Sequence, residues 1–153
     1  MKRTLLIVAL APTLCLAENL VKDGTMDTAT VWSGDRKFET IDDNRVLVLE
    51  SKRNRNAKVA TDVKTRDLHD LVITFRYKSA DFEGRGIQLL CTRPDSSYVY
   101  QNVNVRADDK WHEHTWNFSE VRDARSLEFS IELLEGSGSV LIDDVVIIPR
   151  PTD

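Results

Sequence analysis

From residue 44 onward, apolar and polar residues alternate with a period of two, in short runs separated by turn residues. No stretch of ten or more residues repeats convincingly at the helical spacing. The pattern predicts eight strands, at residues 45–50, 58–63, 71–78, 86–92, 98–106, 111–118, 126–134 and 140–148. Turns are predicted at 42–44, 94–97 and 107–109, and a tight hairpin at 136–139. This pattern indicates an all-β fold, a two-sheet antiparallel β-sandwich of the jelly-roll type.

The alternation also assigns side chains to faces, because successive residues of a strand point to opposite sides of its sheet. If four of the predicted strands are neighbours, their outward positions share one polar and aromatic face: Arg76, Gln88, Tyr98, Tyr100, Asn102, Glu128 and Glu132. The same alternation places Cys91 inside, where it is predicted to be a buried, inert thiol.

Such a face has the chemistry that recognises sugars, whose hydroxyls pair with planar polar groups and whose C–H faces lie on aromatic rings. Tyr98 and Tyr100 are the predicted stacking platforms, and Trp32 is a further candidate in a loop. The predicted hydroxyl readers are three polar side chains: Arg76, Gln88 and Asn102. The alternative interpretation is that paired aromatic residues only stabilise the sheet.

The first residues resemble an export signal rather than part of the fold. Lys2 and Arg3 precede a short apolar run that Pro12 interrupts, and small residues near Ala17 form a plausible cleavage site. The run is too short to span a membrane. We therefore expect residues 1–17 to be a cleaved signal peptide, 18–148 one domain and 149–153 a solvated tail. The predicted location is secreted or periplasmic.

Charge and composition exclude several classes of function. The chain has 21 basic and 25 acidic residues, and loss of Lys2 and Arg3 leaves a net charge of 19 − 25 = −6, so no nucleic-acid partner is expected. His112 and His114 share a face, but two imidazoles do not make a zinc site, so histidines at a sheet edge or partly in the core are expected. No nucleophile motif or phosphate loop is present.

Both ends of the predicted domain resemble one family. The start, NLVKDGTMDTATVW at 19–32, resembles the opening pattern of carbohydrate-binding modules in the family 4, 9 and 22 group. The end, GSVLIDDVVI at 138–147, resembles that group's closing strand with its aspartates, and Trp111 fits its frequent tryptophan. The resemblance implies a galactose-binding-like jelly roll and non-catalytic binding of a polysaccharide or oligosaccharide.

The resemblance also implies one structural calcium ion where the first and last strands meet. By position its ligands would be Asp27 and either Asp143 or Asp144, because calcium takes carboxylate and carbonyl oxygens. Met26 and Asp27 depart from the family's phenylalanine and glutamate, and the side chain of Asp27 is one methylene shorter than that of glutamate. The alternative is that the two adjacent aspartates sit at a bulge and bond to backbone without a metal.

Two other functions stay open besides glycan binding. The chain could be an exported structural or interaction subunit that binds another protein or an enzyme. It could also be a small jelly-roll enzyme acting on polysaccharide, which requires two carboxylates about 5 to 9 Å apart across a cleft. Glu128 and Glu132 lie along one strand and farther apart than one outward step of about 7 Å, which argues against that use.

Overall fold

The computed structural model describes residues 17–28, 30–52, 55–66, 68–119, 121 and 124–151. Most of the predicted signal peptide, residues 1–16, lies outside these ranges. The described residues form strands and loops, and none belongs to a helix that could cross a membrane. The strands are β1 (Ser33–Gly34), β2 (Lys37–Ile41), β3 (Asn44–Glu50), β4 (Ala57–Lys64), β5 (Leu71–Lys78), β6 (Glu83–Gly84), β7 (Ile87–Thr92), β8 (Tyr98–Val103), β9 (His112–Phe118), β10 (Ser126–Leu133), β11 (Gly136–Ser137) and β12 (Ser139–Pro149).

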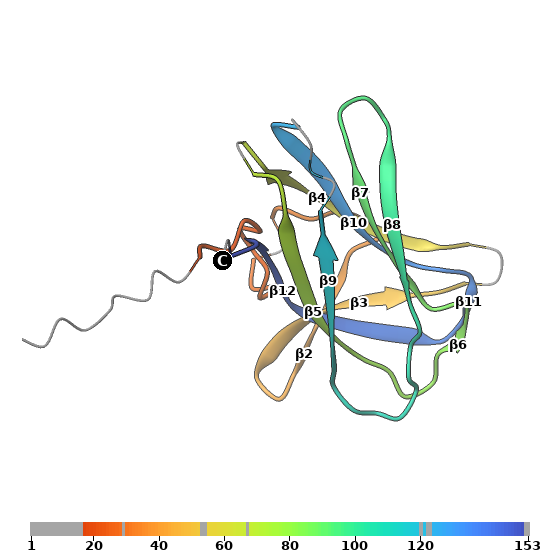
Figure 1. Ribbon diagram of the computed structural model, residues 1–153. Helices are drawn as coiled ribbons and strands as arrows, with labels where there is room; N and C mark the ends of the chain where they lie inside the picture. Colours follow the sequence, from red (N-terminus) through yellow and green to blue (C-terminus); the bar gives the residue numbers. More distant parts are fainter. Residues whose placement is uncertain are drawn as a thin grey trace, which may run out of the picture.

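Two five-stranded antiparallel sheets make up the molecule (Figure 1). One has the order β1-β4-β10-β7-β8, the other the order β2-β3-β12-β5-β9, and β6 pairs with β11 separately. Strands that are neighbours in a sheet are often distant in sequence, as a jelly roll requires. The predicted fold class is therefore confirmed.

All eight predicted strands are present, because alternation with a buried face is a strong local signal. The strand at 71–78 has the predicted bounds, whereas β8 ends at Val103 instead of residue 106. The prediction missed β2, whose more buried positions, Phe38 and Ile41, are three residues apart and so do not alternate. It also missed three strands of two residues each: β1, β6 and β11.

The predicted tight hairpin at 136–139 is wrong. Gly136 and Ser137 form β11 and pair with β6, and the segment carries the chain from β10 in one sheet to β12 in the other. Gly138 has φ +92°, and a Cβ there would lie 2.6 Å from the Asp81 carbonyl oxygen, so glycine is needed at this crossing. The turn predicted at 42–44 is present: Asp42 and Asp43, both with positive φ, form a two-residue hairpin turn between β2 and β3.

The core lies between the sheets and is built from the inward side chains of both. Phe75 and Ile73 on β5 face Leu89 on β7 and Phe129 on β10 across this layer, and all are at most 1% exposed. Cys91 is also buried, as expected. The outward side chains of the main strands are therefore the ones that can contact solvent, form charge pairs or bind a ligand.

The first described residues are tied to the last strand. The Asn19 side chain accepts a hydrogen bond from the Ile147 amide at 2.9 Å and donates one to the Val145 carbonyl at 3.0 Å. Leu20 N–H also donates to the Ile147 carbonyl, and Val145 N–H donates to the Gly24 carbonyl, both at 2.8 Å. The last part of β12, in dark blue, and the segment that follows residue 17, in red and orange, therefore lie together (Figure 1).

Candidate functional site

One outer face stands out, which we call the tyrosine face. It consists of the outward side chains of four adjacent strands, β4, β10, β7 and β8. The strand register aligns them in three rows that cross the sheet: Tyr98–Thr92–Glu128–Asp62, Tyr100–Leu90–Ser130–Ala60 and Asn102–Gln88–Glu132–Lys58. With strands about 4.8 Å apart, each row is about 14 Å long.

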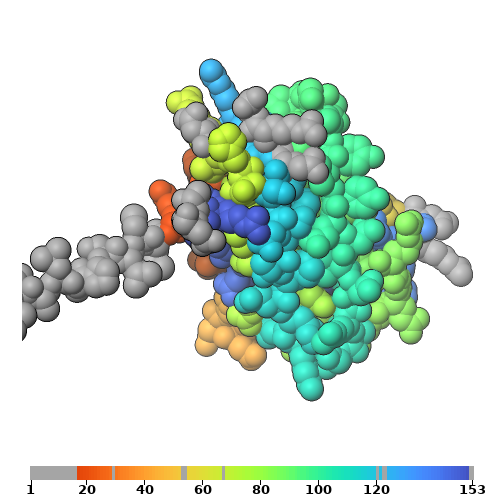
Figure 2. Space-filling model, viewed as in Figure 1, coloured from red at the N-terminus to blue at the C-terminus, as the bar shows by residue number. Residues whose placement is uncertain are grey.

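The two tyrosines form the most exposed aromatic surface of the described residues. Tyr98 is 61% exposed and Tyr100 52%, and their ring centroids are 6.4 Å apart with a 37° tilt. They lie two residues apart on β8, and Val99 between them packs toward the core. Figure 2 views the molecule from the side on which β8, in green, lies at the surface beside β9, in teal. The rings are therefore open to a ligand without any rearrangement.

Two amides lie next to the tyrosines. Gln88 Nε2 donates a hydrogen bond to Asn102 Oδ1 at 3.0 Å, across neighbouring strands in the third row. This bond uses one group of each amide and leaves the other free, so the pair still offers both a donor and an acceptor. Sequence alternation correctly placed all four of these residues on one outward face.

The middle row has small side chains at its centre. Ala60 is 7% exposed and Ser130 is fully buried, even though both lie on the outward side. The Lys58 ammonium reaches Glu128 at 3.3 Å, although Lys58 lies directly opposite Glu132. This ion pair therefore runs diagonally from the third row to the first, across Ala60 and Ser130. Ser130 Oγ has no hydrogen-bond partner among the described residues.

Far from the tyrosines, the first row ends in a hollow that sequence reasoning missed. Asp62 on β4 lies directly opposite Glu128 on β10, and both line the hollow. The other lining residues come from β4, from β1 and from the chain just before β1: Val31, Ser33, Ala60 and Thr61. The alternation of Lys58–Val63, with valines inward, was the signal that could have placed Asp62 on this face.

Two predicted site residues do not belong to this face. Trp32 is 1% exposed, and its indole N–H donates to the Asp23 carbonyl at 3.0 Å, so it is a core residue and no stacking platform. Arg76 is on β5 in the other sheet, because β5 pairs with β12 and β9. Its guanidinium bonds Asp144 at 2.8 Å and lies 4.9 Å from the Trp111 ring centre. Both corrections remove residues from the predicted sugar site.

The adjacent aspartates of β12 sit at a β-bulge. The register with β5 shifts between Asp143 and Val146, and Asp144 has φ 49°. Asp143 is 2% exposed, and it accepts hydrogen bonds from Asn44 Nδ2 at 2.7 Å and from the Asp144 amide at 2.8 Å. Burial raises the pKa of Asp143, and the two hydrogen bonds oppose that rise.

The residues fit a calcium ion only in part. The buried Asp143 carboxylate is suited to be one ligand, but Asp144 is paired with Arg76. Asp27 is exposed, its carboxylate accepts from the Thr25 hydroxyl, and its carbonyl accepts from the Arg45 guanidinium. Among the described residues no group of three metal-binding side chains occurs. The calcium stays a prediction, and any ion held at Asp143 would take most of its oxygens from carbonyls or water.

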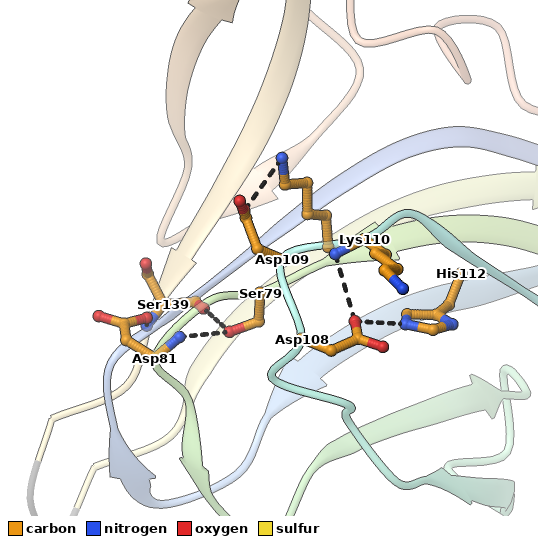
Figure 3. Close-up of polar contacts among 8 residues, drawn as sticks. Ser79, Asp81, Asp108, Asp109, Lys110, His112 and Ser139 are labelled. Carbon is orange, nitrogen blue, oxygen red and sulfur yellow. Dashed lines mark hydrogen bonds and ion pairs between the residues drawn. The ribbon is translucent and has the colours of Figure 1, made fainter.

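The histidines of β9 have structural partners, as expected for an edge strand. His112 Nε2 lies 2.8 Å from Asp108 Oδ1, and this contact lowers the pKa of Asp108 (Figure 3). His114 Nε2 lies 3.2 Å from Gln101 Oε1, which links β9 to β8 behind the tyrosine face. Burial lowers the pKa of His114. The nearby Asp109 pairs with Lys78 at 3.0 Å, so these turn aspartates serve the fold.

Solved structures with the same fold include several carbohydrate-binding modules. TmCBM61, a structure in complex with beta-1,4-galactotriose, has a TM-score of 0.68 at 12% identity over 88% of this chain and 100% of that chain. A family 16 carbohydrate-binding module also has 0.68, at 14% identity over 85% and 99%. The CBM22-1 xylan-binding domain of Paenibacillus barcinonensis Xyn10C has 0.61, at 15% identity over 90% and 97%.

The fold also occurs inside larger proteins. The enzymatically active domain of bacteriophage CBA120 tailspike protein 4 has a TM-score of 0.65 at 10% identity; 86% of this chain is covered but only 21% of that one. An exo-beta-agarase has 0.64 at 11% identity, with 90% and 25% covered. By sequence, the chain matches no family model and no curated protein. The comparisons therefore establish a shared fold, the jelly roll of carbohydrate-binding modules.

Proposed function

We propose that this chain is a non-catalytic carbohydrate-binding module that holds an oligosaccharide, or a segment of a polysaccharide, on the tyrosine face. The observation that carries the proposal is the pair of exposed rings, Tyr98 and Tyr100, beside the free amide groups of Gln88 and Asn102. The fold supports it, since a neighbour of the same architecture was solved with galactotriose and another is described as xylan-binding.

Each part of the face has a distinct task in this proposal. The tyrosine rings stack on the C–H faces of sugar rings and exclude water from them. The free donor and acceptor of the Gln88–Asn102 pair bond to ring hydroxyls, and their mutual hydrogen bond holds them in place. The carboxylates of Glu128 and Glu132, one strand farther on, accept hydrogen bonds from hydroxyls.

The same face argues against hydrolysis. Asp62 and Glu128 are the facing carboxylates, but a hydrolase needs two carboxylates on opposite sides of the bond that it cleaves. Both side chains are exposed on one face of a single sheet, and Glu128 is already paired with the Lys58 ammonium. Binding without bond cleavage is therefore the function that we propose.

We also propose that the module works outside the cytoplasm, on the strength of the signal-like residues 1–17. N-terminal sequencing of protein recovered from the medium or periplasm tests this, and a chain that still starts at Met1 contradicts it.

The binding proposal is tested with the double variant Tyr98→Ala/Tyr100→Ala on a glycan array. We expect it to lose glycan retention with a melting temperature close to that of the wild type, because both rings are largely in solvent. The matched control, Tyr98→Phe/Tyr100→Phe, keeps the stacking surface and retains most of the binding. Undiminished retention by the alanine variant refutes the proposed face. Wild-type protein that binds no glycan but captures another protein supports the interaction-subunit alternative.

A further inference from the structure

The end of the first row opposite Tyr98 has a chemistry of its own. Asp62 and Glu128 are directly opposite each other on antiparallel strands, where like charges destabilise a sheet. Both line one hollow with Ser33. A second hollow, lined by Lys22, Lys64 and other residues of the N-terminal segment and β4, shares Val31, Thr61 and Asp62 with it. The row of carboxylates therefore faces a recess large enough to admit a group from a ligand.

The protein itself shows what kind of group this recess accepts. The Lys58 side chain ends in a primary ammonium, and Glu128 binds it at 3.3 Å. Asp62, across from Glu128, has no hydrogen-bond or ion-pair partner among the described residues. Glu128 therefore already binds the Lys58 ammonium, and the carboxylate of Asp62 is free to bind a second ammonium.

A buried polar atom beside the hollow is an independent sign of a missing partner. Ser130 is on the same outward side, between Glu128 and Glu132 along β10; it is 0% exposed, and its Oγ has no hydrogen-bond partner in the part of the chain that the structure describes. Ser130 lies directly opposite Ala60, which is one of the residues that line the hollow. A hydroxyl can accept a hydrogen bond from an ammonium that displaces or shifts Lys58. Buried hydroxyls normally have partners, so this one needs an explanation.

The spacing determines which part of a glycan would enter the hollow. From β8 to β4 there are three strand intervals, about 14 Å in all. A ring stacked on Tyr98 and a group bound between Asp62 and Glu128 therefore belong to different sugar residues of one chain.

We propose that the hollow between Asp62 and Glu128 is a subsite for the protonated amino group of an amino sugar, within an oligosaccharide whose other end stacks on Tyr98 and Tyr100. This rests on the proposed function. A divalent metal is a poorer occupant, because calcium takes six to eight oxygens and the side chains that line the hollow offer two carboxylates and two hydroxyls. The subsite makes the module selective for partly or fully deacetylated glycans.

The test compares two probes that differ only in the amino group, a β-1,4-linked glucosamine oligosaccharide and its N-acetylated counterpart of the same length. Isothermal titration calorimetry is run with chelator present and at low ionic strength. We expect the wild type to bind the glucosamine probe about two- to fivefold more tightly, which is the scale of an exposed ion pair. The preference shrinks as salt is added, since salt screens exposed charges.

Two variants then test whether Asp62 causes the preference for the glucosamine probe. Asp62→Asn removes one carboxylate and should abolish most of the preference, because it weakens binding of the glucosamine probe more than binding of the acetylated probe. The control, Glu113→Gln, removes the same charge from the exposed outer face of the other sheet and should keep the preference. The subsite is refuted if the wild type binds the two probes equally. It is also refuted if Asp62→Asn and Glu113→Gln lose the preference for the glucosamine probe to the same extent.

The outcomes separate the subsite from the proposed function. If the wild type binds neutral glycans on the array but shows no preference for the glucosamine probe, the subsite is wrong and glycan binding stands. If it binds no glycan at all, both proposals fail.

Discussion

The buried hydroxyl of Ser130, which has no hydrogen-bond partner among the described residues, leads us to predict a substitution that stabilises the protein. Ser130→Ala should stabilise the protein, whereas most substitutions in a core destabilise it. The hydroxyl is removed from water on folding, and no described residue gives it a hydrogen bond in return. Burying such a group costs about 1–3 kcal/mol in measurements on proteins.

The expected gain is smaller than that cost. Alanine is a weaker strand former than most residues, and the lost oxygen takes a few contacts with it. We therefore expect a net stabilisation of about 0.5–2 kcal/mol, which raises the melting temperature of a domain of this size by roughly 2–6 °C. In guanidinium chloride the midpoint should rise with an unchanged slope.

A second serine supplies the matched control. Ser51 is 8% exposed, and its Oγ donates a hydrogen bond to the Leu134 carbonyl at 3.0 Å. Ser51→Ala removes the same atom but leaves that carbonyl without its partner, so it should cost about 1 kcal/mol. The pair thus predicts opposite shifts for one chemical change. A lower denaturation midpoint for Ser130→Ala would show that the hydroxyl has a partner, such as an ordered water, and would refute the reasoning.

Three further predictions concern groups away from the tyrosine face. If the predicted calcium is bound at Asp143, chelator lowers the melting temperature and Asp143→Asn removes that response; a wild type indifferent to chelator in metal-free buffer rules the ion out. The pKa of His114 is lowered by burial, so the unfolded chain binds its proton more readily, and stability should fall as pH drops through about 6.5 toward the folded pKa. His114→Gln should flatten this part of the curve, and an identical curve in both proteins would contradict that assignment. Burial raises the pKa of Cys91 to about 12, so iodoacetamide at pH 8 should leave it unmodified in the native protein lacking residues 1–17 and modify it only in denaturant; rapid native labelling would mean that the strand opens.

The sequence could predict which side of its own sheet each residue occupies, because that depends only on alternation along one strand. It could not predict which strands are neighbours, because pairing is decided by contacts far apart in the chain. Arg76 was assigned an outward side and has one, yet it belongs to the other sheet. Asp62 was overlooked because its partner Glu128 is brought opposite it only by the fold.

Loop residues were harder still, since no periodicity constrains them. Trp32 was expected to be exposed and is buried, with its N–H on a backbone carbonyl that only the folded N-terminal segment supplies. The adjacent aspartates of the last strand were singled out from the sequence, but the side-chain partner of Asp143, Asn44, is 99 residues away. The sequence therefore marked the position, and only the structure shows which group binds its carboxylate.

The hydrogen bonds between Asn19 and β12 bring the points where the polypeptide enters and leaves the domain next to each other. A unit with adjacent ends can be spliced into a surface loop of a host protein, since the host's two cut ends need hardly separate. For the same reason, a circularly permuted version with a short link between its original ends, reopened in an exposed turn, should still fold. A domain with this architecture is thus suited to insertion into different host proteins.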